Sequence, residues 1–363
     1  MATTRCVDWA QKAVARVRRC WVALDKVLDK EQATAYTVHE AFPPKLLAAL
    51  QQCGGTLADH FAEHPAEPDA ALQAFYFDAL HLLRMAELLD AHSMVDITQA
   101  TVPGRSTVCI RNVVPAPFLR PRLEAAHTST LFSATLQPAP YYADLLGLPQ
   151  NHLWVDVESP FQAAQLTVRV ARHISTRYAH RQASLAPIVA LMAQQFAARP
   201  GNYLAFFSSY EYLEQVAALF ADRHPGLPHW CQSRQMGEAG QRQFLERFTD
   251  SSQGIAFAVL GGAFAEGIDL PGRRLIGAFL ATLGLPQVNP VNEQIRQRMQ
   301  ALFGAGYDYA CLYPGLRKVV QAAGRVIRTP SDEGVVHLMD DRFARPEVRA
   351  LLPAWWALGE TPP

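Results

Sequence analysis

The chain has 363 residues, of which 50% are hydrophobic and 18% are charged. At about 150 residues per domain, this length predicts two or three domains, and the composition excludes wholesale disorder. The 33 basic and 33 acidic residues cancel, so no net charge attracts the protein to nucleic acid or to a membrane surface. Any nucleic-acid role must therefore come from a local arrangement of cations.

The cysteines and the apolar runs exclude several classes of protein. No two of the six cysteines form a CxxC pair, which argues against a zinc ribbon, a thioredoxin motif and an iron–sulfur cluster in this chain and favours a reduced, cytoplasmic location. The first twenty residues are rich in arginine and contain no apolar core, so we expect no signal peptide. The longest apolar runs, residues 255–265 and 275–285, are shorter than the ~20 residues of a membrane helix. We therefore expect no membrane association.

Residues 1–95 are expected to form a helical domain, with little sign of strands. Apolar residues recur at helical spacing over residues 14–28. The Pro-Pro pair at 43–44 favours the start of a second helix, and the Gly-Gly pair at 54–55 is expected to interrupt it. A third helix is expected over residues 70–89.

The pattern changes after residue 96. A β-branched run covers residues 107–114, and from residue 166 onward short apolar segments alternate with helix-like segments of 10–15 residues. This alternation is typical of a parallel sheet covered by helices on both faces, and it predicts the α/β class. The expected strands span residues 166–171, 203–207, 255–260, 275–281 and 335–339. The expected helices span residues 184–198, 210–221, 238–248, 292–303 and 316–326.

Two long stretches contain no acidic residue: the one between Asp96 and Glu124, and the one between Glu158 and Glu211. They are explained equally well by a groove that follows phosphates and by a solvated face that acids elsewhere in the fold balance. The arginines within them are Arg105, Arg111, Arg120, Arg122, Arg169, Arg172, Arg177, Arg181 and Arg199.

The strongest chemical signal is Gln321-Ala-Ala-Gly-Arg325-Val-Ile-Arg328, on an expected helix that Pro314 opens. Arg325 and Arg328 are three residues apart, so on a helix they project from the same side. Two guanidinium groups could neutralise charge on a transferred phosphoryl group while Gln321 orients a water, and Gly324 would let another backbone approach. A helix that simply carries two surface arginines is the alternative.

A second signal is the segment VLGGAFAEGIDLPG at residues 259–272. It predicts a buried strand that runs into Gly261 and Gly262, where a ligand could approach the backbone closely. Asp269 could hydrogen-bond a ribose or hold a neighbouring arginine. The alternative is a tight strand connection without a ligand.

Two further segments end expected strands with hydroxyl groups. Ser133 and Thr135 lie in LFSATL at residues 131–136, and Ser208 and Ser209 lie between a strand and a helix in FFSSYEYL. Hydroxyls and free backbone N–H groups at a helix N-terminus bind phosphate, although a serine there is more often a simple helix cap.

Taken together and in their order along the chain, the four segments resemble motifs III, IV, V and VI of the DinG/XPD-type superfamily 2 DNA helicases. The resemblance covers about residues 90–355. It implies two RecA-like lobes with ATP and Mg²⁺ between them, translocation 5′ to 3′ on single-stranded DNA, and a role in DNA repair. By this resemblance, residues 1–95 look like the family's helical arch, residues 96–160 like the tail of the first lobe with motif III and the linker, and residues 161–363 like the second lobe.

The resemblance also implies roles for single residues. Those that would face the γ-phosphate are Gln321, Arg325 and Arg328. Those that would couple the nucleotide to lobe closure are Glu266, Gly267 and Asp269, and Gly324 is expected with them at the cofactor site. Those that would contact the DNA backbone are Ser208 and Ser209, and those that would link the two sites are Ser133 and Thr135.

The sequence departs from the family pattern in the first lobe, because it contains neither a G-x-x-x-x-G-K-[ST] loop nor a DEAH-type box. The chain therefore looks like the C-terminal half of a helicase that needs a separate first lobe, and alone it is expected to hydrolyse no ATP. The rival interpretation is a non-hydrolysing module that binds single-stranded nucleic acid or a protein partner. A Rossmann-like enzyme is a weaker third, since no G-x-G-x-x-G opens a helix.

One further pattern, His60-Phe-Ala-Glu63-His64, matches the H-x-x-E-H sequence of some zinc enzymes. Pro65 follows directly, so the helix is expected to stop there. Short motifs also match by chance, and we expect no metal site.

Overall fold

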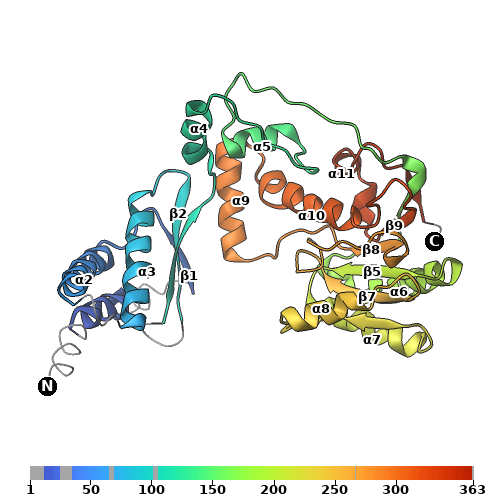
Figure 1. The fold of residues 1–363 in the computed structure, drawn as a ribbon, viewed down its shortest axis with the longest axis horizontal. Helices are drawn as coiled ribbons and strands as arrows, with labels where there is room; N and C mark the ends of the chain where they lie inside the picture. The colour runs from blue at the N-terminus through green and yellow to red at the C-terminus, as the bar shows by residue number, and fades with distance from the viewer. Residues whose placement is uncertain (1–11, 25–34, 65–68, 101–104, 266, 362–363) are drawn as a thin grey trace. The chain divides into compact units, whose positions relative to one another are not determined.

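The computed structural model describes residues 12–24, 35–64, 69–100, 105–265 and 267–361 (Figure 1). The chain divides into two compact units. One comprises Met1–Ser129 and Ala143–Gln150, and the other comprises Thr130–Tyr142 and Asn151–Pro363. Within the described ranges, no helix is both long enough and apolar enough to cross a membrane.

The first unit combines helices with a three-stranded antiparallel sheet in the order β1-β2-β3. Its core is formed by one face of the helix that starts at Pro44, with Leu46, Leu50 and Leu57 buried against Val95 of the sheet. Residues 12–24 are also helical. The strands are β1 (Tyr36–His39), β2 (Ser93–Thr98) and β3 (Thr107–Asn112), and the helices include α2 (Pro44–Glu63), α3 (Ala70–Glu87) and α4 (Ala116–Ala125).

The prediction that residues 1–95 are helical throughout is wrong at β1 and at the start of β2. The sequence of β1, Tyr-Thr-Val-His, alternates apolar and polar residues, but over only four residues, the shortest run that signals a strand. The predicted break at Gly54 is also wrong. Gly54 is buried in the middle of α2, and the packing of that helix outweighs the ~1 kcal/mol that a glycine costs there. The start of α2 at Pro44 and the extent of α3 agree with expectation.

The second unit contains a seven-stranded sheet in the order β10-β4-β9-β8-β5-β7-β6, and all neighbouring strands are parallel. The predicted parallel α/β architecture is thereby confirmed. The strands are β4 (Leu166–Val170), β5 (Asn202–Phe207), β6 (His229–Cys231), β7 (Gly254–Val259), β8 (Gly277–Ala281), β9 (Gly334–Leu338) and β10 (Leu358–Glu360). The main helices are α6 (Arg181–Ala198), α7 (Tyr210–Arg223), α8 (Glu238–Glu246), α9 (Pro290–Phe303) and α10 (Tyr313–Ala323).

Strand β5 shows why this sheet is easy to predict. Its side chains alternate between two cores, so that Leu204 and Phe206 pack on one face while Tyr203 and Phe207 pack on the other. Helices α6 and α7 cover the second of these faces, and α8 and α10 cover the first (Figure 1). Strands β6 and β10 were not predicted, because each has only three residues.

His337 makes the stability of the sheet dependent on pH. It is buried in β9, stacks on Phe279 with ring centroids 5.4 Å apart, and places Nε2 2.9 Å from Oε1 of Gln195. Burial, assisted by the charge of Arg169, lowers the pKa of His337 to about 3. The His337 side chain of the unfolded chain, with a pKa of about 6.5, binds a proton more readily than the buried ring does. The contribution of neutral His337 to folding stability is therefore complete above a pH of about 6.5 and is lost as the pH falls toward 3.

We expect the free energy of unfolding to decrease by about 2 kcal/mol between pH 7 and pH 5 on account of His337 alone. Urea unfolding at the two pH values measures this difference, and His337→Gln, which keeps a donor for Gln195, should reduce it by that amount. An equal pH dependence in the variant and the parent would contradict the assignment.

Candidate functional site

The two arginines of the strongest sequence signal do not lie on a helix. Helix α10 ends at Ala323, so the predicted helix over residues 316–326 is three residues too long. Arg325 and Arg328 instead lie in the loop that leads to β9. The expectation that helical spacing aligns them is wrong, because hydrogen bonds to the neighbouring loop at residues 259–272 favour a non-helical backbone here.

Both arginines nevertheless contact the same segment. Arg325 donates from Nε to the carbonyl oxygen of Ala265 at 3.3 Å and from Nη1 to that of Ile268 at 3.0 Å. Arg328 donates from Nε to Oδ1 of Asp269 at 2.9 Å. Of the two roles that the sequence left open for Asp269, the structure shows the second, in which it holds a neighbouring arginine.

Asp332 organises this pair of loops, and sequence reasoning missed it. Its buried carboxylate accepts hydrogen bonds from the backbone N–H groups of Arg328, Thr329 and Gly272 and from the Thr329 hydroxyl. Burial alone would raise the pKa of Asp332, but these hydrogen bonds lower it below its usual value. The spacing Thr-Pro-Ser-Asp is typical of a side-chain-capped turn, and this was the available signal.

The same turn is bonded to the chain that enters β4. Nε2 of Gln165 lies 2.9 Å from the carbonyl oxygen of Pro330 and 3.0 Å from that of Asp332. Oε1 of Gln165 accepts from the N–H of Gln162 at 2.9 Å. One side chain therefore joins the loop of Arg328 to the first residues of the sheet.

Gln321 lies in the last turn of α10, and its Oε1 atom is buried without accepting a hydrogen bond from the described residues. A buried acceptor left without a donor costs about 1–3 kcal/mol. A donor from a water or a ligand would relieve this cost. Gly324 follows the helix, and its N–H closes the last turn on the carbonyl of Val320 at 2.9 Å.

The 259–272 loop adopts backbone conformations that suit its glycines. Gly261 and Gly267 have φ values of 84° and 74°, in the left-handed region that glycine tolerates best. A Cβ atom at Gly261 would lie 3.5 Å from the side chain of Lys318 on α10. Glu266, which was predicted to act with Gly267, lies outside the described residues.

Ser208 and Ser209 follow the carboxyl end of β5, as predicted, and have different partners. Ser209 caps α7 by accepting from the N–H of Tyr212 at 3.3 Å. Ser208 accepts from Nη2 of Arg181 at 2.9 Å. Ser209 thus shows the simple cap that was the alternative for this pair, whereas Ser208 is joined to a cation.

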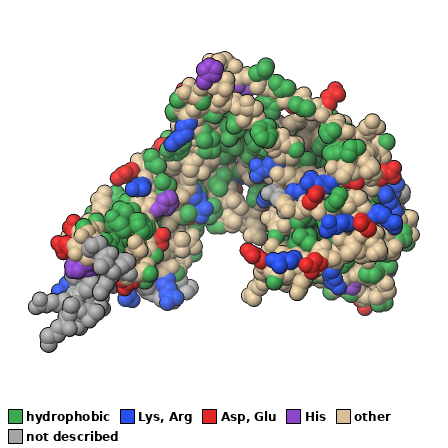
Figure 2. Space-filling view, viewed as in Figure 1, with side chains coloured by type: hydrophobic (Ala, Val, Ile, Leu, Met, Phe, Trp, Pro, Cys, Tyr) green, Lys and Arg blue, Asp and Glu red, His purple; other side chains and the backbone are tan. Residues whose placement is uncertain are grey.

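The acid-free stretch around Arg181 is only partly neutralised by acids from elsewhere. Arg172 pairs with Glu360, and Arg177 pairs with Asp341, each at 2.7 Å. In the part of the chain that the structure describes, Arg181 has no carboxylate at ion-pair distance. On the visible face of the second unit, blue cationic and red acidic side chains are interspersed (Figure 2). Acids from elsewhere in the fold thus pair with Arg172 and Arg177 but, among the described residues, not with Arg181.

Residues 131–136 do not form the predicted strand. No strand of the described chain pairs with them, and a strand requires a hydrogen-bonded neighbour. Ser133 and Thr135 place their hydroxyl oxygens 3.4 Å apart, and the Tyr142 hydroxyl donates to the carbonyl of Thr135 at 2.9 Å. These hydrogen bonds involve none of the arginines above, and Phe132 is 89% exposed.

The helix that carries the H-x-x-E-H pattern ends where expected, just before Pro65. Helix α2 finishes at Glu63, and the rings of His60 and His64 stack with centroids 4.6 Å apart. Among the residues with described positions, no group of three or more His, Cys, Asp or Glu side chains could hold a metal ion.

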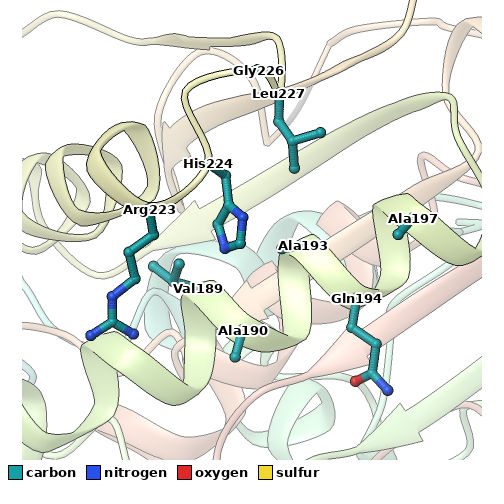
Figure 3. Close-up of a pocket in the computed structure, with 9 residues that line it drawn as sticks. All are labelled: Val189, Ala190, Ala193, Gln194, Ala197, Arg223, His224, Gly226 and Leu227. Carbon is teal, nitrogen blue, oxygen red and sulfur yellow. The ribbon is translucent and has the colours of Figure 1, made fainter.

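An open pocket of about 800 Å³ lies away from these motifs, between α6 and the end of α7 with its following loop (Figure 3). Small side chains of α6, including Ala190, Ala193 and Ala197, form one wall, and Arg223 and His224 stand opposite. None of the residues predicted from the sequence lines it, so the candidate site is a surface of loops rather than this pocket.

Comparison with known proteins matches residues 192–359 to the helicase C-terminal domain family. The XPD helicase subunit of transcription and DNA repair factor IIH from Dictyostelium discoideum is 27% identical over 179 residues, which are 46% of this chain and 23% of that protein. The ATP-dependent helicase DinG from Mycobacterium tuberculosis is 27% identical over 264 residues, 70% of this chain and 39% of that protein. The chain spans less than half the length of these relatives.

Solved structures show the same fold. Those named XPD_APO and XPD_Helicase each superpose with a TM-score of 0.60, at 18% and 19% identity. The matched regions cover 90% and 97% of this chain and 65% and 64% of those chains. At these identities the similarity establishes the architecture of the chain.

Proposed function

We propose that this chain is the second motor lobe of an ATP-dependent DNA helicase, because residues 192–359 match the helicase C-terminal domain family and the chain is similar to DinG and XPD helicases. The supporting observation is that Arg325 and Arg328 are both held by one neighbouring loop. Ala265 and Ile268 bind Arg325, and Asp269 binds Arg328. Their proposed role is to neutralise charge on the γ-phosphate during transfer to water.

The contacts of the two arginines suit that role. Arg325 is oriented by the carbonyl oxygens of Ala265 and Ile268. Arg328 is held through Nε alone by Asp269, with 36% of its side chain exposed, so its remaining donors are available to phosphate oxygens. Gln321 is proposed to orient the attacking water, since its buried Oε1 atom still lacks a donor.

The remaining parts of the motor would come from elsewhere. The given sequence contains no Walker A loop and no DEAH-type box, so ATP and Mg²⁺ would be held by a first motor lobe that lies outside it. Ser208 and Ser209, at the carboxyl end of β5, are proposed to contact single-stranded DNA as the strand moves. Ser133 and Thr135 would connect the two sites once that lobe is present.

The test is a chimera in which this chain replaces the matched region of the mycobacterial helicase. We expect the chimera to hydrolyse ATP when single-stranded DNA is added, and this chain alone to show no turnover. Circular dichroism and thermal unfolding would first establish that the chimera is folded.

Two results would contradict the proposal that this chain is a lobe of an ATP-dependent helicase. The first is a folded chimera that binds single-stranded DNA without hydrolysing ATP, which would favour a non-hydrolysing binding module. The second is stoichiometric ATP turnover by this chain alone, which would place the phosphate-binding groups within it.

A further inference from the structure

Tyr178 presents an aromatic ring to solvent near the proposed DNA-binding end of the sheet. It begins the short 3₁₀ turn Tyr178–His180 directly before α6, and it is 84% exposed. Single exposed aromatic residues are common and need no explanation. This one differs because its ring is backed by a cation: Cζ of Arg181 lies 5.3 Å from the ring centroid.

The cation behind the ring is held in place. The guanidinium of Arg181 also lies 5.2 Å from the ring of Tyr212 and donates to Ser208 at 2.9 Å. Tyr212 is itself fully buried, with its hydroxyl 2.5 Å from Oγ of Ser184. The half-buried guanidinium that backs the Tyr178 ring is therefore held between a buried tyrosine and a serine hydroxyl.

The backbone of the turn is fixed as well. Arg177, the residue before Tyr178, donates from Nη1 to both carboxylate oxygens of Asp341 at 2.7 and 2.9 Å. His180, at the end of the turn, places Nδ1 2.9 Å from Oγ of Ser175. Since both ends of the turn are tied to neighbouring groups, the ring is preorganised and little entropy is lost when a flat partner covers it.

The chemistry around the ring suits a nucleotide. Arg181 has no carboxylate partner in the described part of the chain, and Ser208 beside it is one of the proposed DNA-backbone contacts. An aromatic face next to a cation and a hydroxyl group combines what single-stranded nucleic acid requires, a surface for a base and donors for its phosphate.

We propose that Tyr178 is a stacking platform for one base of single-stranded DNA, with Arg181 fixing the ring from behind and Ser208 marking the path of the backbone. This inference rests on the proposed function. Stacking on a π-face tolerates any base, so the contact adds grip at each step without adding sequence preference.

Fluorescence anisotropy of the full chain with a labelled oligo-dT strand tests the proposal. Tyr178→Ala should weaken binding by about tenfold, within the range found for loss of one stacked base, whereas Tyr178→Phe and Tyr178→Trp should bind as the parent does. Tyr307→Ala is the matched control, since Tyr307 is an exposed tyrosine of the same unit outside the platform, and it should leave affinity unchanged.

A second strand, in which abasic sites replace the thymidines, separates stacking from other effects. The parent should bind it about tenfold more weakly than oligo-dT, and Tyr178→Ala should cause no further loss. If Tyr178→Ala leaves the affinity for oligo-dT unchanged, or lowers the affinity for both strands equally, Tyr178 does not stack on a base. The proposal that this lobe binds DNA would be unaffected by that result. If the parent binds neither strand, the proposed DNA contact of this lobe fails and the platform fails with it.

Discussion

Replacing Arg328 by alanine should slow ATP hydrolysis by about a thousandfold in the chimera described above, the magnitude typical of an arginine that stabilises phosphoryl transfer. The reason is geometric. Asp269 holds Arg328 through Nε, 2.9 Å from Oδ1, and leaves the terminal nitrogens available. Steady-state turnover with saturating DNA measures the effect, and affinity for single-stranded DNA should change little, because the arginine lies in a different loop from Ser208.

Two further variants sharpen this experiment. Arg242→Ala removes an exposed arginine of α8 and should leave turnover unchanged. Asp269→Asn should have a smaller effect than Arg328→Ala, since it loosens the arginine without removing its charge. If Arg328→Ala lowers turnover and DNA affinity together, along with the melting temperature, the residue acts by supporting the loop and not by contacting phosphate.

Replacing Gly284 by alanine should lower the free energy of unfolding by about 3 kcal/mol. Gly284 follows β8 with φ at 73°, and an added Cβ atom would clash with the backbone carbonyl oxygen of Gly315 in α10. The left-handed backbone contributes about 1 kcal/mol of the loss, and the clash, which only a backbone shift can relieve, contributes the rest. Urea unfolding monitored by circular dichroism provides the measurement.

Gly304 offers a matched control for the steric part. It has nearly the same backbone conformation, with φ at 69° at the end of α9, but nothing lies within 4 Å of its added Cβ atom. Gly304→Ala should therefore cost only about 1 kcal/mol. Equal losses for the two variants would show that backbone strain, and not the contact between Gly284 and Gly315, accounts for the effect.

The sheet of the second unit was predictable because each of its longer strands can be recognised from its own residues. Strands such as β5 are continuously apolar and are followed by helices of regular period, so each element could be identified from its own residues. Strand β1 has only four residues, and its short alternation of apolar and polar residues is a much weaker signal. Residues 131–136 show the opposite case, in which a strand-like sequence forms no strand among the described residues.

The pairing of Arg325 and Arg328 on one segment was predictable from the sequence, but their geometry was not. The sequence brings Arg325 and Arg328 forward as a pair, yet it places them on a helix. Their actual alignment depends on Ala265, Ile268 and Asp269, about 60 residues earlier in the chain. The contact of Arg181 with Ser208 was missed for the same reason, since contacts between distant segments leave no periodic trace in a sequence. Asp332 was missed although its bonds to Arg328 and Thr329 are local.

Gln165 has a consequence for how a displacement would pass through the second unit. Its amide nitrogen is shared among the carbonyls of one turn, the turn that Asp332 closes beside Arg328, while its own oxygen holds the chain just before β4. A displacement of that turn must either break these bonds or pull on the root of β4. The hydrogen bonds of Gln165 thus couple movement of the turn to movement of the chain that enters β4.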